Sequence, residues 1–260
     1  MDESERLDAS NKLQAVEAPV FDEIHPELFT KTETGIIDSF ITLLSSVFND
    51  IEKCNILDLA CGTGRLSTRF LENGFSVTSV DLSPDMLRVF KNKLDAESLG
   101  RSEIVNSEVF SFIENTDKKF DCIVAGAFLH HVPDIDDLMS KLKCCLKPES
   151  FVFFIHEPAR REKNKLFFGR CLERIDSVLF QLSYLLRTGR FIPRLKEYGT
   201  ADIHTKFGID HVMLEEALKK EGFEVLNNEV FFSHKTAFVN FIDSKVLKLL
   251  PQFFISARMK

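Results

Sequence analysis

A carboxylate and two glycines stand together in one short stretch of the chain. The stretch is Asp58-Leu59-Ala60-Cys61-Gly62-Thr63-Gly64, directly after the apolar run 55–59 and before a helix expected at about 64–72. Glycine lets the backbone turn sharply and lets a ligand approach the main chain. Asp81 ends a second apolar run, where a carboxylate can accept hydrogen bonds from ribose hydroxyls. The stretch therefore predicts a turn that binds a nucleoside.

The charge of Asp58 separates the two cofactor classes that use such a turn. A dinucleotide places its pyrophosphate at the helix N-terminus and favours a third glycine, where Ser67 stands here. A carboxylate opposes a pyrophosphate and attracts a cation, by about 4 kcal/mol for unit charges ~4 Å apart at an effective dielectric constant of ~20. S-adenosylmethionine (SAM) carries a sulfonium and an ammonium, so SAM is favoured over NAD. An ordinary strand-to-helix turn without a ligand is the purely structural interpretation.

The segments around this turn alternate between short apolar runs and amphipathic helices. Strands alternating with helices of 10–15 residues predict a mostly parallel sheet with helices on both faces. The last two apolar runs are joined by a short link, which favours an antiparallel pair at the sheet edge. The runs expected to be strands are 55–59, 75–81, 101–106, 120–125, 150–157, 223–232 and 252–259.

These motifs resemble those of class I SAM-dependent methyltransferases that act on small molecules. Asp58-x-Ala60-x-Gly62-x-Gly64 is similar to the first motif of that family, with alanine in the first glycine slot, and Asp81-Leu82 is similar to its ribose and adenine contact. Phe128-Leu129-His130-His131-Val132-Pro133-Asp134 resembles the loop after its fourth strand. The resemblance covers about residues 35–157 and, more loosely, 209–260.

The resemblance implies an α/β fold with a doubly wound, Rossmann-like sheet of seven strands in the order 3-2-1-4-5-7-6, the last strand antiparallel. It also implies that SAM is bound and S-adenosylhomocysteine released. Glu108 stands where the family places an acid on the adenine amino group, although that acid is usually aspartate. The residues expected to contact the cofactor are Asp58, Ala60, Gly62, Gly64, Asp81, Leu82, Met86, Glu108, Val109 and Ala125.

Polar residues follow the fourth and fifth expected strands, where the acceptor would react, because ligands of open parallel sheets bind beyond the carboxyl ends of the strands. His130, His131, His156 and Glu157 are the expected catalytic residues, with an imidazole as general base. A packing or loop-capping role for His130 and His131 is the alternative. Positioning alone can supply much of the catalysis of an in-line displacement, so a base is needed only if the nucleophile carries a proton.

Residues 158–208 interrupt the α/β pattern and carry a net charge of +6, against −13 in the remainder of the chain. We expect this insert to form a lid and substrate element that could attract an anionic acceptor, such as a carboxylate, a phosphorylated sugar or a lipid headgroup. Tyr198, Asp202 and His204 are the expected substrate residues. Their spacing, together with that of His156 and Glu157, is not diagnostic of a metal, and no metal site is predicted.

The same insert contains an apolar stripe at helical spacing, which predicts an amphipathic helix of about 23 residues ending at Thr188-Gly189. Packing of the stripe on the core is the favoured interpretation, and contact with a lipid surface is the alternative. The stripe consists of Phe168, Leu172, Ile175, Leu179, Leu182 and Leu186.

Four units are expected along the 260 residues. Residues 1–33 form an acidic segment, partly disordered and able to cover the cofactor, and residues 34–157 form the SAM-binding core. The basic helical insert 158–208 follows, and residues 209–260 complete the sheet.

Composition limits the remaining function classes. A content of 44% apolar and 28% charged residues is typical of a globular protein, and the net charge of −7 disfavours nucleic acid as a partner. No uncharged apolar run reaches 18 residues, so no membrane span is expected, and the acidic start 1–5 does not resemble a signal peptide. Six cysteines without CxxC spacing favour a reducing, cytoplasmic location.

We therefore expect a methyltransferase that acts on a small-molecule acceptor, most readily on oxygen, with nitrogen and carbon left open. Sequence signatures of methylation at adenine N6, glutamine amides and cytosine C5 are absent. The alternative is a SAM-binding, non-catalytic subunit that stabilises or regulates a partner enzyme. An NAD-dependent dehydrogenase ranks third, because Asp58 and Ser67 disfavour it. The acceptor and the oligomeric state are not determined by the sequence.

Overall fold

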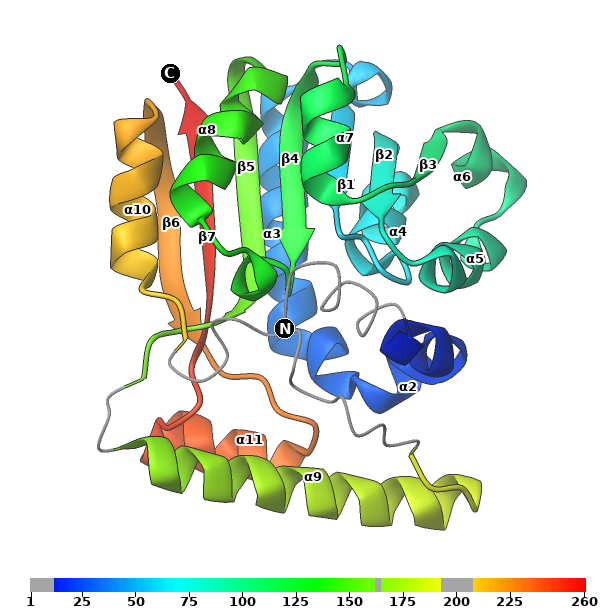
Figure 1. The fold of residues 1–260 in the computed structure, drawn as a ribbon, viewed down its shortest axis with the longest axis vertical. Coiled ribbons are helices and arrows are strands. Elements are labelled where there is room, and N and C mark those ends of the chain that lie inside the picture. Colours follow the sequence, from blue (N-terminus) through cyan, green and yellow to red (C-terminus); the bar gives the residue numbers. More distant parts are fainter. Residues whose placement is uncertain (1–11, 162–164, 193–207) are drawn as a thin grey trace.

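The computed structural model describes residues 12–161, 165–192 and 208–260. Seven strands form one sheet in the order β3-β2-β1-β4-β5-β7-β6 (Figure 1). Strands β1 to β5 are parallel, and β7 runs antiparallel to both β5 and β6. The expected fold class, strand order and antiparallel last strand are confirmed. The strands are β1 (Asn55–Leu59), β2 (Ser76–Asp81), β3 (Ser102–Asn106), β4 (Phe120–Gly126), β5 (Leu146–Pro158), β6 (Phe223–Phe231) and β7 (Gln252–Met259).

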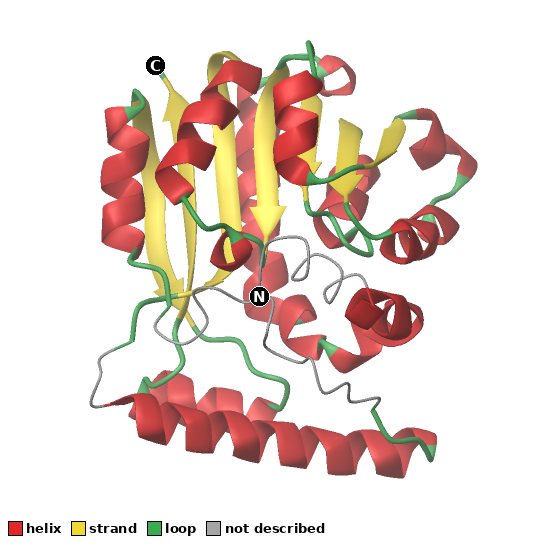
Figure 2. Cartoon of the chain, viewed as in Figure 1, coloured by secondary structure: helices red, strands yellow, loops and turns green. Residues whose placement is uncertain are grey.

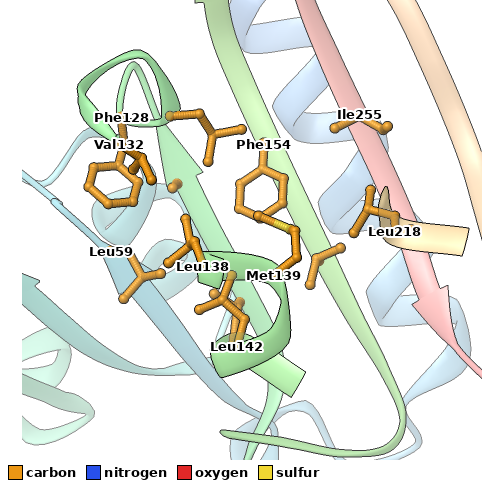
Figure 3. Packing of buried hydrophobic residues seen from close by; sticks show 14 of the residues in the cluster. Leu59, Phe128, Val132, Leu138, Met139, Leu142, Phe154, Leu218 and Ile255 are labelled. Carbon is orange, nitrogen blue, oxygen red and sulfur yellow. The ribbon is translucent and has the colours of Figure 1, made fainter. Parts of the chain in front are cut away.

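Helices cover both faces of the sheet (Figure 2). On one face, α3 (Lys31–Val47), α4 (Arg65–Glu72) and α5 (Pro84–Lys93) bury apolar side chains against β1, β2 and β5. On the other face, α7 (Val109–Asn115), α8 (Ile135–Cys145) and α10 (His211–Lys220) enclose the second half of the core, part of which is shown in Figure 3. The short helix α6 (Ala96–Gly100) precedes β3. This three-layer arrangement leaves the carboxyl ends of the parallel strands for a ligand.

Two helix starts are capped by side chains. Ser83 accepts a hydrogen bond from the Met86 backbone at the start of α5, and Asp134 does the same for Asp137 at the start of α8. The end of α8 is followed directly by β5. The helix ends at Cys145, and Lys147 and Pro148 already lie in β5, which begins at Leu146 and pairs with Phe120 of β4.

The insert places a long helix beyond the carboxyl ends of the strands. Helix α9 (Leu166–Thr188) has 23 residues and ends at Gly189 in a left-handed conformation, as expected. It lies beside α11 (Ala237–Ile242), which a π-helix at Asp243–Leu247 continues (Figure 1). None of the described helices combines the length and the apolar character that a bilayer crossing requires.

The face that α9 turns to the core is not the predicted one. The buried residues are Gly169, Leu172, Asp176, Phe180 and Tyr184, so only Leu172 of the predicted stripe is buried. Two contacts explain this orientation. A Cβ atom at Gly169 would already lie 3.3 Å from Leu250 Cδ2, and the Asp176 carboxylate accepts hydrogen bonds from the backbone N–H groups of Lys235 and Thr236. A small residue and a buried carboxylate thus fix the helix, and the stripe faces solvent.

Candidate active site

The glycine turn between β1 and α4 holds three residues at positive φ: Ala60 (52°), Gly62 (54°) and Gly64 (82°). A Cβ atom at Gly64 would lie 1.9 Å from Phe90 Cδ2, so only glycine fits there. A Cβ atom at Gly62 would meet no atom of the described residues within 4 Å. The described part of the chain therefore leaves space beside the Gly62 backbone, and its contact with a ligand stays a prediction.

The two aspartates of the turn lie deeper than expected. Asp58 is 1% exposed, and its Oδ2 accepts hydrogen bonds from the Ser67 backbone N–H (3.0 Å) and hydroxyl (2.6 Å). Burial raises its pKa to about 7, although the hydrogen bonds from Ser67 lower it in part. The sequence argument placed this carboxylate at the mouth of the turn. It lies instead beneath the turn, where it orders the first turn of α4 and acts on a ligand only through its field.

Asp81 lies at the carboxyl end of β2, beside Gly62. Its Oδ2 accepts a hydrogen bond from the Gly62 N–H (2.7 Å), and its Oδ1 accepts one from the Ser83 N–H (2.8 Å). Burial raises the pKa of Asp81 above its ordinary value, although both N–H groups oppose the shift. A carboxylate oxygen has two lone pairs, so each oxygen keeps one for a ribose hydroxyl.

The other residues expected at the cofactor surround this edge. Met86, Val109 and Ala125 are buried, and Leu82 is partly exposed after β2. Glu108 caps α7, because its two carboxylate oxygens accept hydrogen bonds from the backbone N–H groups of Phe110 (3.0 Å) and Ser111 (2.7 Å). Its contact with an adenine stays a prediction.

Helix α2 (Phe21–Ile24) carries the N-terminal segment to the turn. Asp22 accepts hydrogen bonds from the Thr63 hydroxyl (2.6 Å) and from Lys93 Nζ (2.5 Å), and Lys93 also donates to the Thr63 carbonyl (2.9 Å). The same segment reaches the insert, since Ile24 packs with Phe180 and Tyr184 of α9. The segment therefore joins the core to the insert across the glycine turn.

Arg65, the residue after the turn, lies under this segment. Its Nη1 donates to the Leu28 carbonyl (3.1 Å) and to Glu33 Oε2 (3.0 Å). Its Nη2 is buried, has no hydrogen-bond partner among the described residues, and lies beside the end of β4, 2.4 Å from where a Gly126 Cβ would stand. A buried donor without a partner is costly, so an acceptor from a bound ligand would be favourable here.

Glu33 connects Arg65 to a histidine that lies 123 residues further along the chain. The side chain of Glu33 is fully buried, and its Oε1 is 2.5 Å from His156 Nδ1. A carboxylate can only accept, so in the neutral imidazole the proton lies on Nδ1 and the lone pair on Nε2. His156 itself has a φ of 61° at a bulge in β5, where the pairing with β7 shifts register between Ile155 and Glu157.

Glu157 serves the neighbouring histidine loop. It is fully buried, and it accepts hydrogen bonds from the Phe128, Leu129 and His130 backbone N–H groups and lies 2.8 Å from His130 Nδ1. Burial alone would raise its pKa, but His130 and the backbone donors outweigh this effect and hold the pKa below its ordinary value. Glu157 is thus occupied in holding the loop, which leaves it a positioning role.

His130 and His156 line the same cavity of about 530 Å³ at the ends of β4 and β5. Arg161, Leu166, Arg170 and Glu173 also line it. Arg161 Nη1 donates to Glu173 (2.7 Å), and its Nε is buried without a partner among the described residues. A larger cavity of about 830 Å³ lies between α8 and α10 and contains none of the residues predicted for the site.

The structure therefore brings together some of the predicted site residues and adds others. His130 and His156 share a cavity. His131 is exposed and packs against His130, with ring centroids 4.1 Å apart and the ring planes tilted by 42°. Tyr198, Asp202 and His204 lie outside the described residues. Glu33 and Arg65 were missed. Thr30 and Glu33 have the spacing of a capping box, and the partner of Glu33 is distant in sequence, so no local pattern indicated its role. Among the described residues, no cluster of potential metal ligands is found.

A family model described as a methyltransferase domain matches residues 56–149. Together with the strand order 3-2-1-4-5-7-6 and the glycine turn beside Asp81, this match makes residues 56–149 similar to the SAM-binding domain of class I methyltransferases.

Individual relatives match over the same core. The chain is 31% identical over 108 residues to the ubiquinone biosynthesis O-methyltransferase of Hydrogenovibrio crunogenus. The aligned stretch covers 41% of this chain and 44% of the relative. It is 36% identical over 107 residues to the putative methyltransferase YqeM of Bacillus subtilis, 40% and 42% of the two chains. The chain thus spans less than half the length of these curated relatives.

A solved structure shares the fold over nearly the whole chain. It is the magnesium protoporphyrin IX methyltransferase of Synechocystis PCC 6803 with bound S-adenosylhomocysteine. The alignment covers 97% of this chain and all of that one, with a TM-score of 0.55 and 13% identity. At this identity the likeness shows the fold alone.

Proposed function

We propose that this chain transfers a methyl group from SAM to an oxygen of a small-molecule acceptor by in-line displacement, with His156 as general base. The observation that carries the proposal is the Glu33–His156 pair. A buried glutamate holds Nδ1 of His156 at 2.5 Å, and His156 lines a cavity at the carboxyl ends of β4 and β5. Such an arrangement fixes the tautomer of a base and orients it.

Three features at the glycine turn support SAM as the cofactor. The open backbone at Gly62 admits a nucleoside, and Asp81 beside it can accept from the ribose hydroxyls. The unpartnered Nη2 of Arg65 can donate to the carboxylate of the amino-acid end. SAM supplies an electrophilic methyl group on a sulfonium that leaves as a neutral thioether. The described N-terminal segment, held to the turn by Asp22, would then cover the pocket and exclude water.

The chain's residues supply positioning and proton transfer. A hydroxyl acceptor must lose a proton as it attacks, and His156 Nε2 can take that proton. Arg65 and His156 both bind the same glutamate, so Glu33 ties the base to the residue that follows the glycine turn. Glu33 would thereby fix the base relative to the residue that contacts the methyl donor. Such fixed orientation of the reacting groups increases the rate of transfer.

The acceptor cavity is positively lined, which supports an anionic acceptor. Arg161 and Arg170 stand beside the two imidazoles, and Glu173 is the one acid among the described residues that line it. The buried Nε of Arg161 is a donor that a carboxylate or phosphate could satisfy. A relative named as an O-methyltransferase of ubiquinone biosynthesis supports methylation on oxygen.

The Glu33–His156 pair does not support the alternative of a non-catalytic subunit. A subunit that only binds SAM does not need a buried glutamate to hold an imidazole toward a second cavity. Retention of such a pair costs desolvation of both groups, so a catalytic use is the simpler explanation.

The test separates cofactor binding from transfer. Isothermal titration with SAM, S-adenosylhomocysteine and NAD should show binding of the first two. Asp81→Ala should weaken SAM binding by about 10-fold or more, because it removes hydrogen bonds to a charged group. A labelled-methyl screen of metabolite extracts, read by a gain of 14 daltons, should then find the acceptor.

The variants His156→Ala and Glu33→Gln should retain SAM binding and lower transfer, His156→Ala by about 10²–10⁴-fold. His211→Ala, on α10 away from the cavity, is the matched control and should retain both activities. Binding of NAD alone would refute the cofactor. Full transfer by His156→Ala would refute the base, and SAM binding without transfer in any extract would favour the non-catalytic subunit.

A further inference from the structure

Helix α9 presents an apolar face to solvent. The residues that it buries, Leu172 of the predicted stripe among them, face the core, and the remaining stripe residues are exposed. Phe167 is 70% exposed and Leu186 is 87% exposed. We call this surface the outer face of α9, and its large apolar residues are Phe167, Phe168, Ile175, Val178, Leu179, Leu182 and Leu186.

The outer face is larger than a scattered set of surface residues. Its seven side chains leave on the order of 700 Å² of apolar area in solvent, taking ~150–200 Å² for each side chain when fully accessible. The largest apolar patch on a typical monomer is about 300–600 Å², and larger patches mark binding surfaces. The face runs along a single helix of 23 residues, about 34 Å, so it is narrow and continuous.

The rim of the outer face is basic. The exposed charged residues on α9 and on the adjacent segment 237–248 are Arg170, Glu173, Arg174, Arg187, Lys245 and Lys248. The single acid in this set, Glu173, is paired with Arg161, whereas Asp176 and Asp243 are buried. The chain as a whole has a net charge of −7, so this set of residues differs in sign from the chain.

Charge decides between the possible occupants of this face. A second copy paired through α9 would bring its own arginines and lysines against these, and the exposed part of this rim has no unpaired acid to complement them. Anionic lipid headgroups complement the rim. Phenylalanine and leucine on one side of a helix, flanked by arginine, are typical of a helix that lies in the plane of a lipid surface.

We propose that α9 docks flat on an anionic lipid surface, with its outer face at the boundary between headgroups and acyl chains. Leu166, Arg170 and Glu173 of the same helix line the cavity that contains His156. If the proposed function holds, that cavity then opens close to the headgroups, so that an anionic amphiphile partitioned in the lipid could reach it. The docking itself does not depend on methyl transfer and can be tested without an acceptor.

The test is cosedimentation of the full chain with vesicles of phosphatidylcholine alone or with about 30% phosphatidylglycerol. We expect partition onto the anionic vesicles at least about 10-fold above that onto neutral ones, with a fall at high salt. Leu182→Glu with Ile175→Glu should reduce partition by about 10-fold or more. Val212→Glu on α10 is the matched control, because Val212 and Leu182 are equally exposed at 53%. It should bind as the unmodified chain does.

Two further measurements keep the outcomes distinct. Arg174→Glu with Arg187→Glu should abolish the preference for anionic vesicles, and each variant should keep its unfolding temperature and its SAM affinity. Failure of SAM binding would count against the proposed function alone. Absence of vesicle binding, or equal binding to both vesicle types, would overturn the docking. A dimer in sedimentation velocity that Leu182→Glu dissociates would assign the face to a second copy instead.

Discussion

The conformation of the glycine turn depends on the absence of a side chain at Gly64. Gly64 has a φ of 82° and packs directly on Phe90, so Gly64→Ala combines backbone strain with a steric clash. We expect a loss of about 2–4 kcal/mol in the free energy of unfolding, from about 1–3 kcal/mol for each effect. Urea denaturation measures it.

Gly35→Ala is the control for this substitution. Gly35 lies inside α3, where a Cβ atom would meet nothing within 4 Å, and alanine favours a helix by up to about 1 kcal/mol. Equal effects of the two substitutions would contradict the steric explanation.

The charge of Glu157 gives a dependence of stability on pH. Its pKa is lowered in the folded protein from a value of 4.5, so the stabilisation is present above about pH 4.5 and is lost as the pH falls through the lowered pKa. Glu157→Gln removes the charge and leaves backbone N–H groups poorly paired, which we expect to cost about 2–3 kcal/mol at pH 7. Urea midpoints of both proteins between pH 3 and 7 check this. A difference that does not shrink at low pH would contradict it.

The sequence predicted residues that are local to one turn and missed those that depend on distant partners. Gly62, Gly64 and Asp81 follow from a motif, and all three lie at the turn. The motif shows that Asp58 belongs to the strand, but it does not show that the side chain is buried. Glu33 could not be found, because its role comes from Arg65 and His156, which only the folded sheet brings to it.

At the scale of helices and strands, periodicity predicted the extent of α9 but not its orientation. Apolar residues occur around much of this helix, so a 4-3-4-3-4 stripe was one of two apolar faces. The deciding groups are polar or small: Asp176 and Gly169 make contacts that a hydrophobic pattern does not register. An amphipathic pattern predicts burial only when one face alone is apolar.

Asp176 should therefore hold α9 in place. Its carboxylate accepts from the Lys235 and Thr236 backbone and from the Thr236 hydroxyl (2.6 Å), just before α11. Asp176→Ala leaves these donors unsatisfied, so we expect a loss of about 2–4 kcal/mol. Hydrogen exchange should rise in residues 235–250 and in α9.

Ser177→Ala, one residue further along α9, is the control for this change. Unchanged exchange in Asp176→Ala would show that apolar packing alone fixes the helix.

At the scale of the whole molecule, the sequence predicted the sheet and, in part, its surroundings. The alternation of strands and helices indicates a mostly parallel sheet, and the resemblance to a known family supplied the strand order. The segments outside that alternation, residues 18–33 and α9 with α11, meet at one end of the sheet. Their meeting depends on contacts such as Lys235 Nζ with the Ile24 carbonyl (2.8 Å), which no local pattern predicts.

The meeting of these segments should control exchange of the cofactor. Asp22 bonds to both Thr63 and Lys93, so the N-terminal segment must detach before a nucleoside bound at the turn can leave. We expect Asp22→Ala to raise the dissociation rate of S-adenosylhomocysteine by about 10-fold, which corresponds to a barrier lowered by about 1.4 kcal/mol. Stopped-flow displacement measures the rate, and Asp85→Ala on α5 is the control. An unchanged rate would show that the segment does not restrict exit.

The bulge in β5 has a consequence for how this chain could change over generations. Because successive strand residues point to opposite faces, the irregularity lets two adjacent positions, His156 and Glu157, serve two different neighbours at one edge. Loss of a single residue there would disturb both the imidazole held by Glu33 and the carboxylate that holds the loop after β4. Insertions and deletions at residues 155–157 should therefore be tolerated far less than substitutions, and a saturating indel library selected for folding would reveal this.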